Sequence, residues 1–350
     1  MKTTISSALM LIISMVGFSQ AIWIANNNTG AVPGPKVKTG ATALSDAIAA
    51  AANGDIIYVV PGGSTYNTTL VNKSVSIFRS GFNPDKSSSM TSNCQSITGS
   101  ANNVRLSGLM VSRYILVSAG FSGTLIDKCR VERFEIGAVG STIIQNCIFG
   151  ESTSSFTSLS SDLTSSSLRL SNNIIYGTTN GWLRHLGGAI IENNVFVGFG
   201  GQPDFHAFDG VLGCTIRNNI FFGVQPRGVS APGFLNNNQQ NNLSFGATDN
   251  SFVDAAFGNV ASNNIVGQDP QFVNLPVLDP SVYNNSYDAH LKTTSPAIGT
   301  GFGGIDMGVY GGLTPFDPFG TSLPIVKTIT AAGSVLQGTN MNVRVQGKGN

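Results

Sequence analysis

Two histidines, an arginine, a tryptophan and an aspartate gather near the middle of this chain, at Trp182, Arg184, His185, Asp204 and His206. An imidazole beside a carboxylate can exchange protons with a substrate, and an arginine can hold the carboxylate of a uronic acid. His185 and His206 each follow an Asn-Asn pair at the same distance, which predicts adjacent coils of a repeat. We therefore take this stretch as the candidate ligand-contact surface. The alternative is an exposed polar strip that binds nothing.

Charged residues are scarce. They make up 11% of the chain, against about 25% in typical soluble domains. The net charge of +1 excludes a strongly basic groove for nucleic acid. The densest charge run, Arg130, Glu132, Arg133 and Glu135, is interpreted as solvated ion pairs of little energetic weight. Because the carboxylates are scattered, we expect no metal site and no cofactor.

A short repeated pattern predicts the fold. It consists of an aliphatic residue, a polar residue, Asn-Asn or an equivalent pair, and two mostly apolar residues, as in IENNVF at 191–196. The second Asn position recurs about every 22 residues, at Gly108, Cys129, Cys147, Asn173, Asn194, Asn219, Asn242 and Asn264. This period is that of one coil of a parallel β-helix, and the β-branched and aromatic content favours strands. We therefore predict an all-β, three-sheet solenoid of about 10–12 coils.

Stacking the coils assigns a face to each position of the repeat. The aliphatic position and the second apolar position point inward, and the polar position faces water. We expect burial of Ile144, Phe149, Ile191, Phe196, Ile216 and Phe221, and exposure of Gln145, Glu192 and Arg217. The asparagines are interpreted as structural, because stacked side chains at the first Asn position can hydrogen-bond along the stack. Cys129 and Cys147 share one column, where we expect free, buried thiols rather than a disulfide.

Both ends of such a solenoid need covers. Residues 42–52 predict a capping helix, with Thr42 as N-cap and Leu44, Ala47, Ile48 and Ala51 on its buried face. Residues 55–62 then predict the first strand and turn. We assign residues 22–320 to the β-helix with its N-terminal cap, and 321–350 to a closing hairpin or tail.

The N-terminus has the features of a secretory signal peptide. Lys2 precedes an apolar run at 8–18 that is too short to span a bilayer. Small residues at Ser19 and Ala21 predict cleavage after Ala21, so residues 1–21 form the signal peptide. We expect a secreted mature chain without a transmembrane segment. Nothing in the sequence specifies its oligomeric state.

Three stretches resemble the pectate-lyase-like superfamily of right-handed parallel β-helices. Residues 43–61 are similar to its opening helix and first strand, and residues 104–266 to its asparagine-turn coils. The segments SPAIG at 295–299 and DMGVYG at 306–311 are similar to its exit segment. The resemblance implies right-handed coiling of the bacterial secreted type. It does not fix an activity, because the superfamily includes lyases, polygalacturonases and adhesins.

The catalytic signatures of that superfamily are missing from this sequence. It has no adjacent Asp-Asp pair, no Gly-His-Gly and no carboxylate cluster able to hold Ca²⁺. This favours a non-catalytic, secreted protein that binds glycans or has a surface or structural role, with a polysaccharide as the expected partner. The alternative is a polysaccharide lyase or glycoside hydrolase acting on an acidic polysaccharide, so whether the chain is an enzyme stays open.

Overall fold

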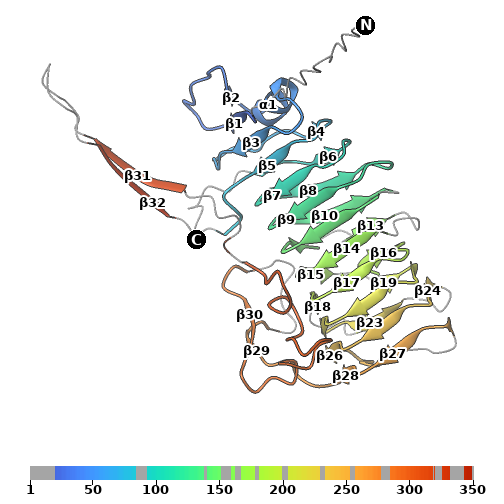
Figure 1. Ribbon diagram of the computed structural model, residues 1–350. Coiled ribbons are helices and arrows are strands. Elements are labelled where there is room, and N and C mark those ends of the chain that lie inside the picture. Colours follow the sequence, from blue (N-terminus) through green and yellow to red (C-terminus); the bar gives the residue numbers. More distant parts are fainter. Residues whose placement is uncertain are drawn as a thin grey trace, which may run out of the picture.

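The chain forms a parallel β-solenoid of about eight turns, with only 4% of its residues helical. The computed structural model describes residues 20–83, 93–137, 140–150, 159–161, 167–177, 181–198, 204–228, 233–252, 257–276, 284–317, 319, 325–331 and 343–348. Figure 1 shows the turns stacked in chain order from helix α1 (Ala43–Ala50) at one end. The all-β solenoid predicted from the repeat is confirmed.

The first sheet runs the length of the stack. In spatial order its twelve strands are β2 (Val37–Thr39), β1 (Ile22–Asn26), β3 (Ile56–Val59), β5 (Ser76–Phe78), β7 (Arg105–Ser107), β9 (Thr124–Asp127), β11 (Thr142–Gln145), β14 (Leu168–Ser171), β17 (Ile190–Glu192), β21 (Thr215–Arg217), β25 (Asn238–Gln240) and β27 (Val260–Ser262). Every pair in this series is parallel. The aliphatic position of the repeat lies in this sheet and points inward.

The second sheet has fourteen strands and divides into two faces. The strands are β4 (Thr69–Val71), β6 (Ile97–Gly99), β8 (Met110–Val117), β10 (Arg130–Ile136), β12 (Ile148–Phe149), β13 (Leu159–Ser161), β15 (Ile174–Gly177), β16 (Leu183–Arg184), β18 (Val195–Gly198), β19 (His206–Asp209), β22 (Ile220–Phe222), β23 (Gln225–Gly228), β26 (Leu243–Phe245) and β28 (Ile265–Val266). The long strand β10 pairs with β12 through its first residues and with β13 through its last. From there the β12–β28 series and the β13–β23 series form separate faces, so later turns have the three faces expected from the repeat.

The remaining described strands form three two-stranded sheets. A parallel pair, β20 (Val211–Leu212) and β24 (Phe234–Leu235), lies at a corner of the later turns. The antiparallel pair β29 (Phe272–Asn274) and β30 (Asp288–Leu291) lies beside the last turns. An antiparallel hairpin of β31 (Ile325–Ala331) and β32 (Val343–Lys348) extends away from the stack in Figure 1.

The number of turns is smaller than the predicted 10–12. The last strands of the solenoid are β27 and β28. The chain after Val266 leaves the stack, forms β29 and β30, and then runs back along the outside. The first strand of the fold is β1, ahead of the segment at 55–62 that we took as first.

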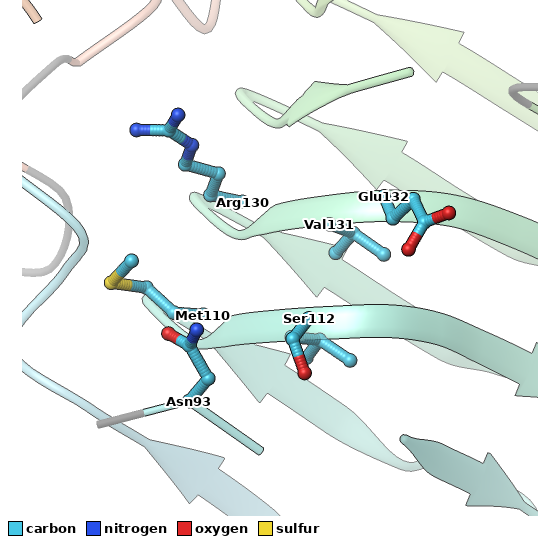
Figure 2. A pocket seen from close by; sticks show the side chains of 7 residues that line it. Asn93, Met110, Ser112, Arg130, Val131 and Glu132 are labelled. Atoms are coloured by element: carbon cyan, nitrogen blue, oxygen red, sulfur yellow. The ribbon is translucent and has the colours of Figure 1, made fainter. Parts of the chain in front are cut away.

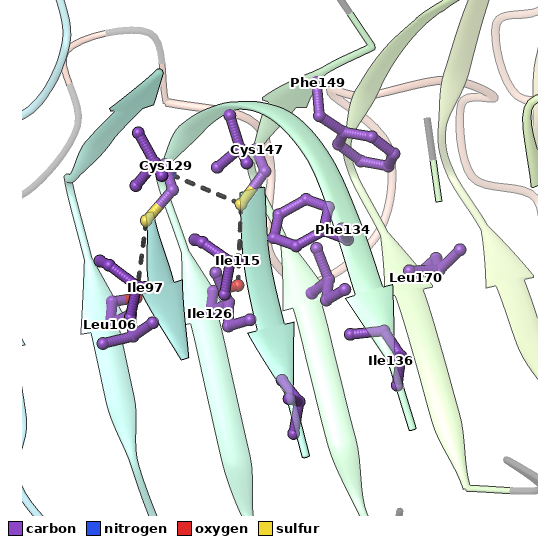
Figure 3. Close-up of a cluster of buried hydrophobic side chains, with 14 of the residues drawn as sticks. Ile97, Leu106, Ile115, Ile126, Cys129, Phe134, Ile136, Cys147, Phe149 and Leu170 are labelled. Atoms are coloured by element: carbon purple, nitrogen blue, oxygen red, sulfur yellow. Dashed lines mark hydrogen bonds between the residues drawn. The ribbon is translucent and has the colours of Figure 1, made fainter. Parts of the chain in front are cut away.

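Aromatic and aliphatic side chains fill the solenoid, as the repeat predicted. All six residues expected to be buried are fully enclosed. Phe196 stacks on Phe221 at 4.6 Å between ring centroids, and Phe134 meets Phe149 edge-on at 4.9 Å. Figure 3 shows the earlier part of this core, where Cys129 and Cys147 lie in adjacent turns. Both thiols are free and buried, as expected, and burial raises the pKa of Cys129 well above its ordinary value.

The two asparagine positions have different roles, which corrects our interpretation of the first. The second Asn position, not the first, forms the ladder along the stack. The side-chain amide of Asn173 donates to Asn194 Oδ1 at 3.0 Å, and Asn194 donates to Asn219 in the same way at 2.9 Å. The first Asn position has positive φ, as at Asn172 (55°) and Asn193 (55°). Asparagine is one of the few residues that accept this left-handed conformation.

The first-position asparagines hold a returning segment, residues 295–317, which we call the C-terminal strap. Asn172 Nδ2 donates to the backbone oxygens of Val309 at 2.8 Å and Gly311 at 2.7 Å. Further bonds join Asn146 to Thr314, Asn193 to Asp306, and Asn241 to Thr300. The strap covers an outward apolar column of the β12–β28 face, and together they form a second hydrophobic core. This face of the solenoid is therefore occupied by the chain itself.

The N-terminal helix lies where the sequence predicted it, but Thr42 does not cap it through a side-chain hydrogen bond. Leu44, Ala47, Ile48 and Ala51 are buried as predicted. Thr42 immediately precedes the helix, but its hydroxyl binds the Asp46 carboxylate at 2.8 Å instead of a backbone N–H.

Glu192 departs from its predicted exposure. Gln145 and Arg217 are partly exposed, but Glu192 is only 5% exposed. Its carboxylate lies between Arg169 and Arg217, which belong to the neighbouring turns of the first sheet. The Arg217 ion pair measures 2.8 Å, and this bracketing supplies the partners that a buried carboxylate needs.

Candidate functional site

Trp182 cannot present a ring to a sugar, because it belongs to the core. It is 1% exposed, and its indole stacks on Phe196 with ring centroids 6.4 Å apart. The absence of a side chain at Gly177 leaves the room that the indole occupies. The candidate ligand-contact surface therefore loses its aromatic member.

The two histidines do not stack. Their equal distances from the preceding Asn-Asn pairs predicted that they would lie on adjacent coils in the same position. Leu183 pairs with Phe208 and Arg184 with Asp209, so His185 lies against Gly210 in the next turn. His206 lies one turn from Gly181, whose N–H donates to the His206 backbone oxygen at 2.8 Å. Four residues separate the two positions along the strands, about 13 Å at 3.3 Å per residue. The four additional residues of the later coil lie between Gly198 and His206, and they shift the register.

His185 and Arg184 have local structural partners. His185 follows β16 with φ of 55°, so it occupies a left-handed turn position at the surface. Arg184 Nε lies 3.2 Å from Asp209 Oδ2 in an ion pair between adjacent turns. Both side chains are about one-third exposed, and such pairs contribute little to stability.

His206 instead belongs to a second polar cluster, formed with the next turn. It pairs with Gln225, and Gln225 Nε2 donates to the Asp204 backbone oxygen at 3.1 Å. Arg227 lies 2.6 Å from Asp249 and donates to Gln225 Oε1 at 3.2 Å. Burial and the Arg227 charge lower the pKa of His206 and outweigh the opposing effect of Asp204 and Asp249. A neutral imidazole at this position could accept a proton.

A pocket of about 260 Å³ lies on the outer surface of β8 and β10, outside the stretch singled out by sequence. Its lining residues are Asn93, Met110, Val111, Ser112, Arg130, Val131 and Glu132. Figure 2 shows Arg130, Met110 and Asn93 on one side and Ser112 and Glu132 farther along the strands. The pocket thus combines a guanidinium, a carboxylate, a hydroxyl, an amide and an apolar side chain.

The register between β8 and β10 shifts beside this pocket. The register shifts between Val131 and Arg133, so β8 has one residue more than β10 at this point. Both Glu132 and Arg133 are partly exposed. Arg133 pairs with Glu135 at 2.8 Å and lies over the Tyr114 ring at 5.2 Å. The expected ion pairing is present for Arg133 and Glu135. Arg130 and Glu132 line the pocket.

Asn93, which lines the pocket, also carries a buried acceptor. The Oδ1 atom of Asn93 is buried and has no hydrogen-bond partner among the described residues. A buried acceptor without a donor costs free energy. The concentration of four charges at 130–135, in a chain with 11% charged residues, was the sequence signal for this site.

The described residues contain neither a metal-binding cluster nor a membrane-spanning helix. Within those ranges, no group of three or more His, Cys, Asp or Glu side chains is placed to hold a metal ion. No helix in the described part of the chain is both long and apolar enough to cross a membrane.

No protein-family model matches this chain, and no curated protein sequence matches it either.

Proposed function

We propose that this chain is a secreted β-solenoid that binds polysaccharide without cleaving it, through the outer surface of β8 and β10. The observation that carries the proposal is the pocket lined by Arg130, Glu132 and Ser112. Sugars offer hydroxyl groups that both donate and accept hydrogen bonds. A carboxylate accepts from them, a guanidinium donates to them, and a serine hydroxyl does both.

Two further features support a binding role. Parallel strands form a regular, rigid surface, so an extended polymer could contact successive turns without reordering the protein. The predicted N-terminal signal peptide supports export to the cell exterior, where a secreted protein can meet polysaccharides. Membership of the pectate-lyase-like superfamily, with right-handed coiling, is part of the proposal and is supported by the asparagine-turn coils.

The test is a glycan array probed with the wild-type protein and with Arg130→Ala and Glu132→Gln. Loss of one charge-assisted hydrogen bond should weaken binding of the preferred glycan about 10- to 100-fold. Arg113→Ala is the matched control, because Arg113 is an exposed arginine of β8 outside the pocket lining. Equal binding by wild type and both pocket variants would contradict the proposal.

A lyase acting on an acidic polysaccharide is the second candidate, and the half-buried His206 favours it. Its lowered pKa keeps the imidazole neutral near pH 7, and Arg227 lies on the adjacent strand. An incubation with uronate polymers, followed by the ultraviolet absorbance of unsaturated products, tests this role. Product that disappears in His206→Ala would establish the lyase, and absence of product would leave binding as the function.

A further inference from the structure

The fold begins before the predicted cleavage site. The Ala21 N–H donates to Asp55 Oδ1 at 2.8 Å, and the Ala21 oxygen accepts from the Ile56 N–H at 2.9 Å. Ala21 also packs against the main core. It is therefore the residue that starts the pairing of β1 with β3.

Asp55 makes Ala21 difficult to remove. Its carboxylate is 6% exposed, and its other oxygen accepts from Trp23 Nε1 and from the Ala52 N–H, each at 2.9 Å. Burial alone would raise the pKa of Asp55, but these three hydrogen bonds and the Lys36 charge lower it. Without residue 21, Oδ1 would lose its Ala21 donor while staying largely out of water, which is costly for a charged group.

Gln20 also contacts the fold. Its side-chain amide donates to the Gly54 oxygen at 2.7 Å, next to Asp55. A second pair of small residues, Gly17 and Ser19, precedes it with the spacing that a leader peptidase requires. Cleavage after Ser19 satisfies the sequence rule and keeps every contact of Ala21. Cleavage after Ala21 satisfies the rule but removes those contacts.

We propose that the leader is removed at the Ser19–Gln20 bond, so that the mature chain begins with Gln20. This rests on the secretion in the proposed function. Hydrolysis adds one water to the amide, leaving a carboxylate on Ser19 and an ammonium group on Gln20. The amino-terminal Gln can then cyclise by attack of its amine on its side-chain amide, with loss of ammonia. The cut lies two residues upstream of the Ala21–Ile22 bond.

The direct test is to express residues 1–350 in an exporting bacterial host and to sequence the N-terminal peptide of the exported protein by mass spectrometry. A first residue of Gln20, open or cyclised, supports the proposal. A first residue of Ala21 or Ile22 overturns it while leaving secretion intact. A chain that keeps its leader and stays inside the cell overturns the secretion proposal, and the cleavage proposal with it.

A stability measurement tests the physical reason separately. Chains beginning at Gln20, Ala21 and Ile22 can be released from a removable fusion partner and compared by thermal unfolding. The Ile22 chain should melt at least about 2–4 °C below the other two, since it lacks a hydrogen bond to a buried carboxylate. Asp55→Asn should lower the melting temperature of the Gln20 chain more than that of the Ile22 chain. Equal melting temperatures for all three chains would overturn the inference that Ala21 belongs to the fold.

Discussion

One column of the second sheet passes through two different environments. Following the register, it reads Met110 and Arg130 in the earlier turns, and then Ile148, Ile174, Val195, Ile220 and Leu243 in the later turns. The later part is fully buried under the C-terminal strap, whereas Met110 and Arg130 line the pocket. The strap therefore determines which turns can meet a ligand. Of the two open positions, Arg130 is charged, whereas Met110 is apolar and also packs against the edge of the second core.

The largest expected effect comes from the covered half of the column. Ile220→Ala removes a fully buried side chain packed between the sheet and the strap, so it should cost about 2–5 kcal/mol in the free energy of unfolding. Arg130→Ala, at the equivalent position of the open half, should change that free energy by less than about 0.5 kcal/mol. Urea unfolding of both variants measures the difference. Similar costs at the two positions would mean that the strap does not pack as described.

A smaller effect is expected from the asparagines that hold the strap. Asn172→Gly keeps the left-handed backbone conformation but removes three side-chain hydrogen bonds to the strap, so it should cost about 1–3 kcal/mol. Proteolysis within residues 295–317 should accelerate in this variant. Asn103→Gly is the matched control, since Asn103 has the same positive φ and no hydrogen bond to the strap is shown for it. Equal proteolysis rates in the two variants would contradict the inference that Asn172 holds the strap.

The smallest effect is a pH dependence at the polar cluster that His206 forms with Gln225, Arg227 and Asp249. The folded state lowers the pKa of His206 below its ordinary value of 6.5, so protonation favours the unfolded chain. His206 should therefore destabilise the protein as pH falls below about 6.5, and the effect should vanish as pH rises above that value. Comparing the melting temperatures of wild type and His206→Gln at pH 5 and pH 8 measures it. A wild-type protein that gains stability from His206 at pH 5 would contradict the direction of the shift.

The inner face of the solenoid could be predicted from sequence because it depends on local periodicity. Most coils place an aliphatic residue inward at the same position, so the burial of residues such as Ile144 and Phe196 follows from their position in the repeat. The role of the first Asn position depended on a segment that lies 59 to 168 residues later in the chain, which no local pattern reveals. One signal was present in the sequence: both positions after the Asn pair are apolar, which is typical of strands covered on both faces.

The candidate site was harder to predict, because it depends on register between turns. A four-residue difference in coil length separates His185 from His206, and the indole of Trp182 turns inward where Gly177 leaves space. The pocket at Arg130 and Glu132 lies where the register between β8 and β10 shifts by one residue. Neither the place of an insertion within a coil nor a bulge is encoded in composition or period.

Met110 allows a direct test of the proposed polysaccharide-binding surface. It lines the pocket and is partly exposed, so hydroxyl radicals should oxidise its thioether in the free protein. Saturating the protein with the glycan selected on the array should protect Met110 and leave the oxidation of His206 unchanged. Met307, which is 1% exposed beneath the strap, serves as the internal reference. Protection of His206 with unchanged oxidation of Met110 would contradict the proposed binding surface and place the ligand on the polar cluster around His206.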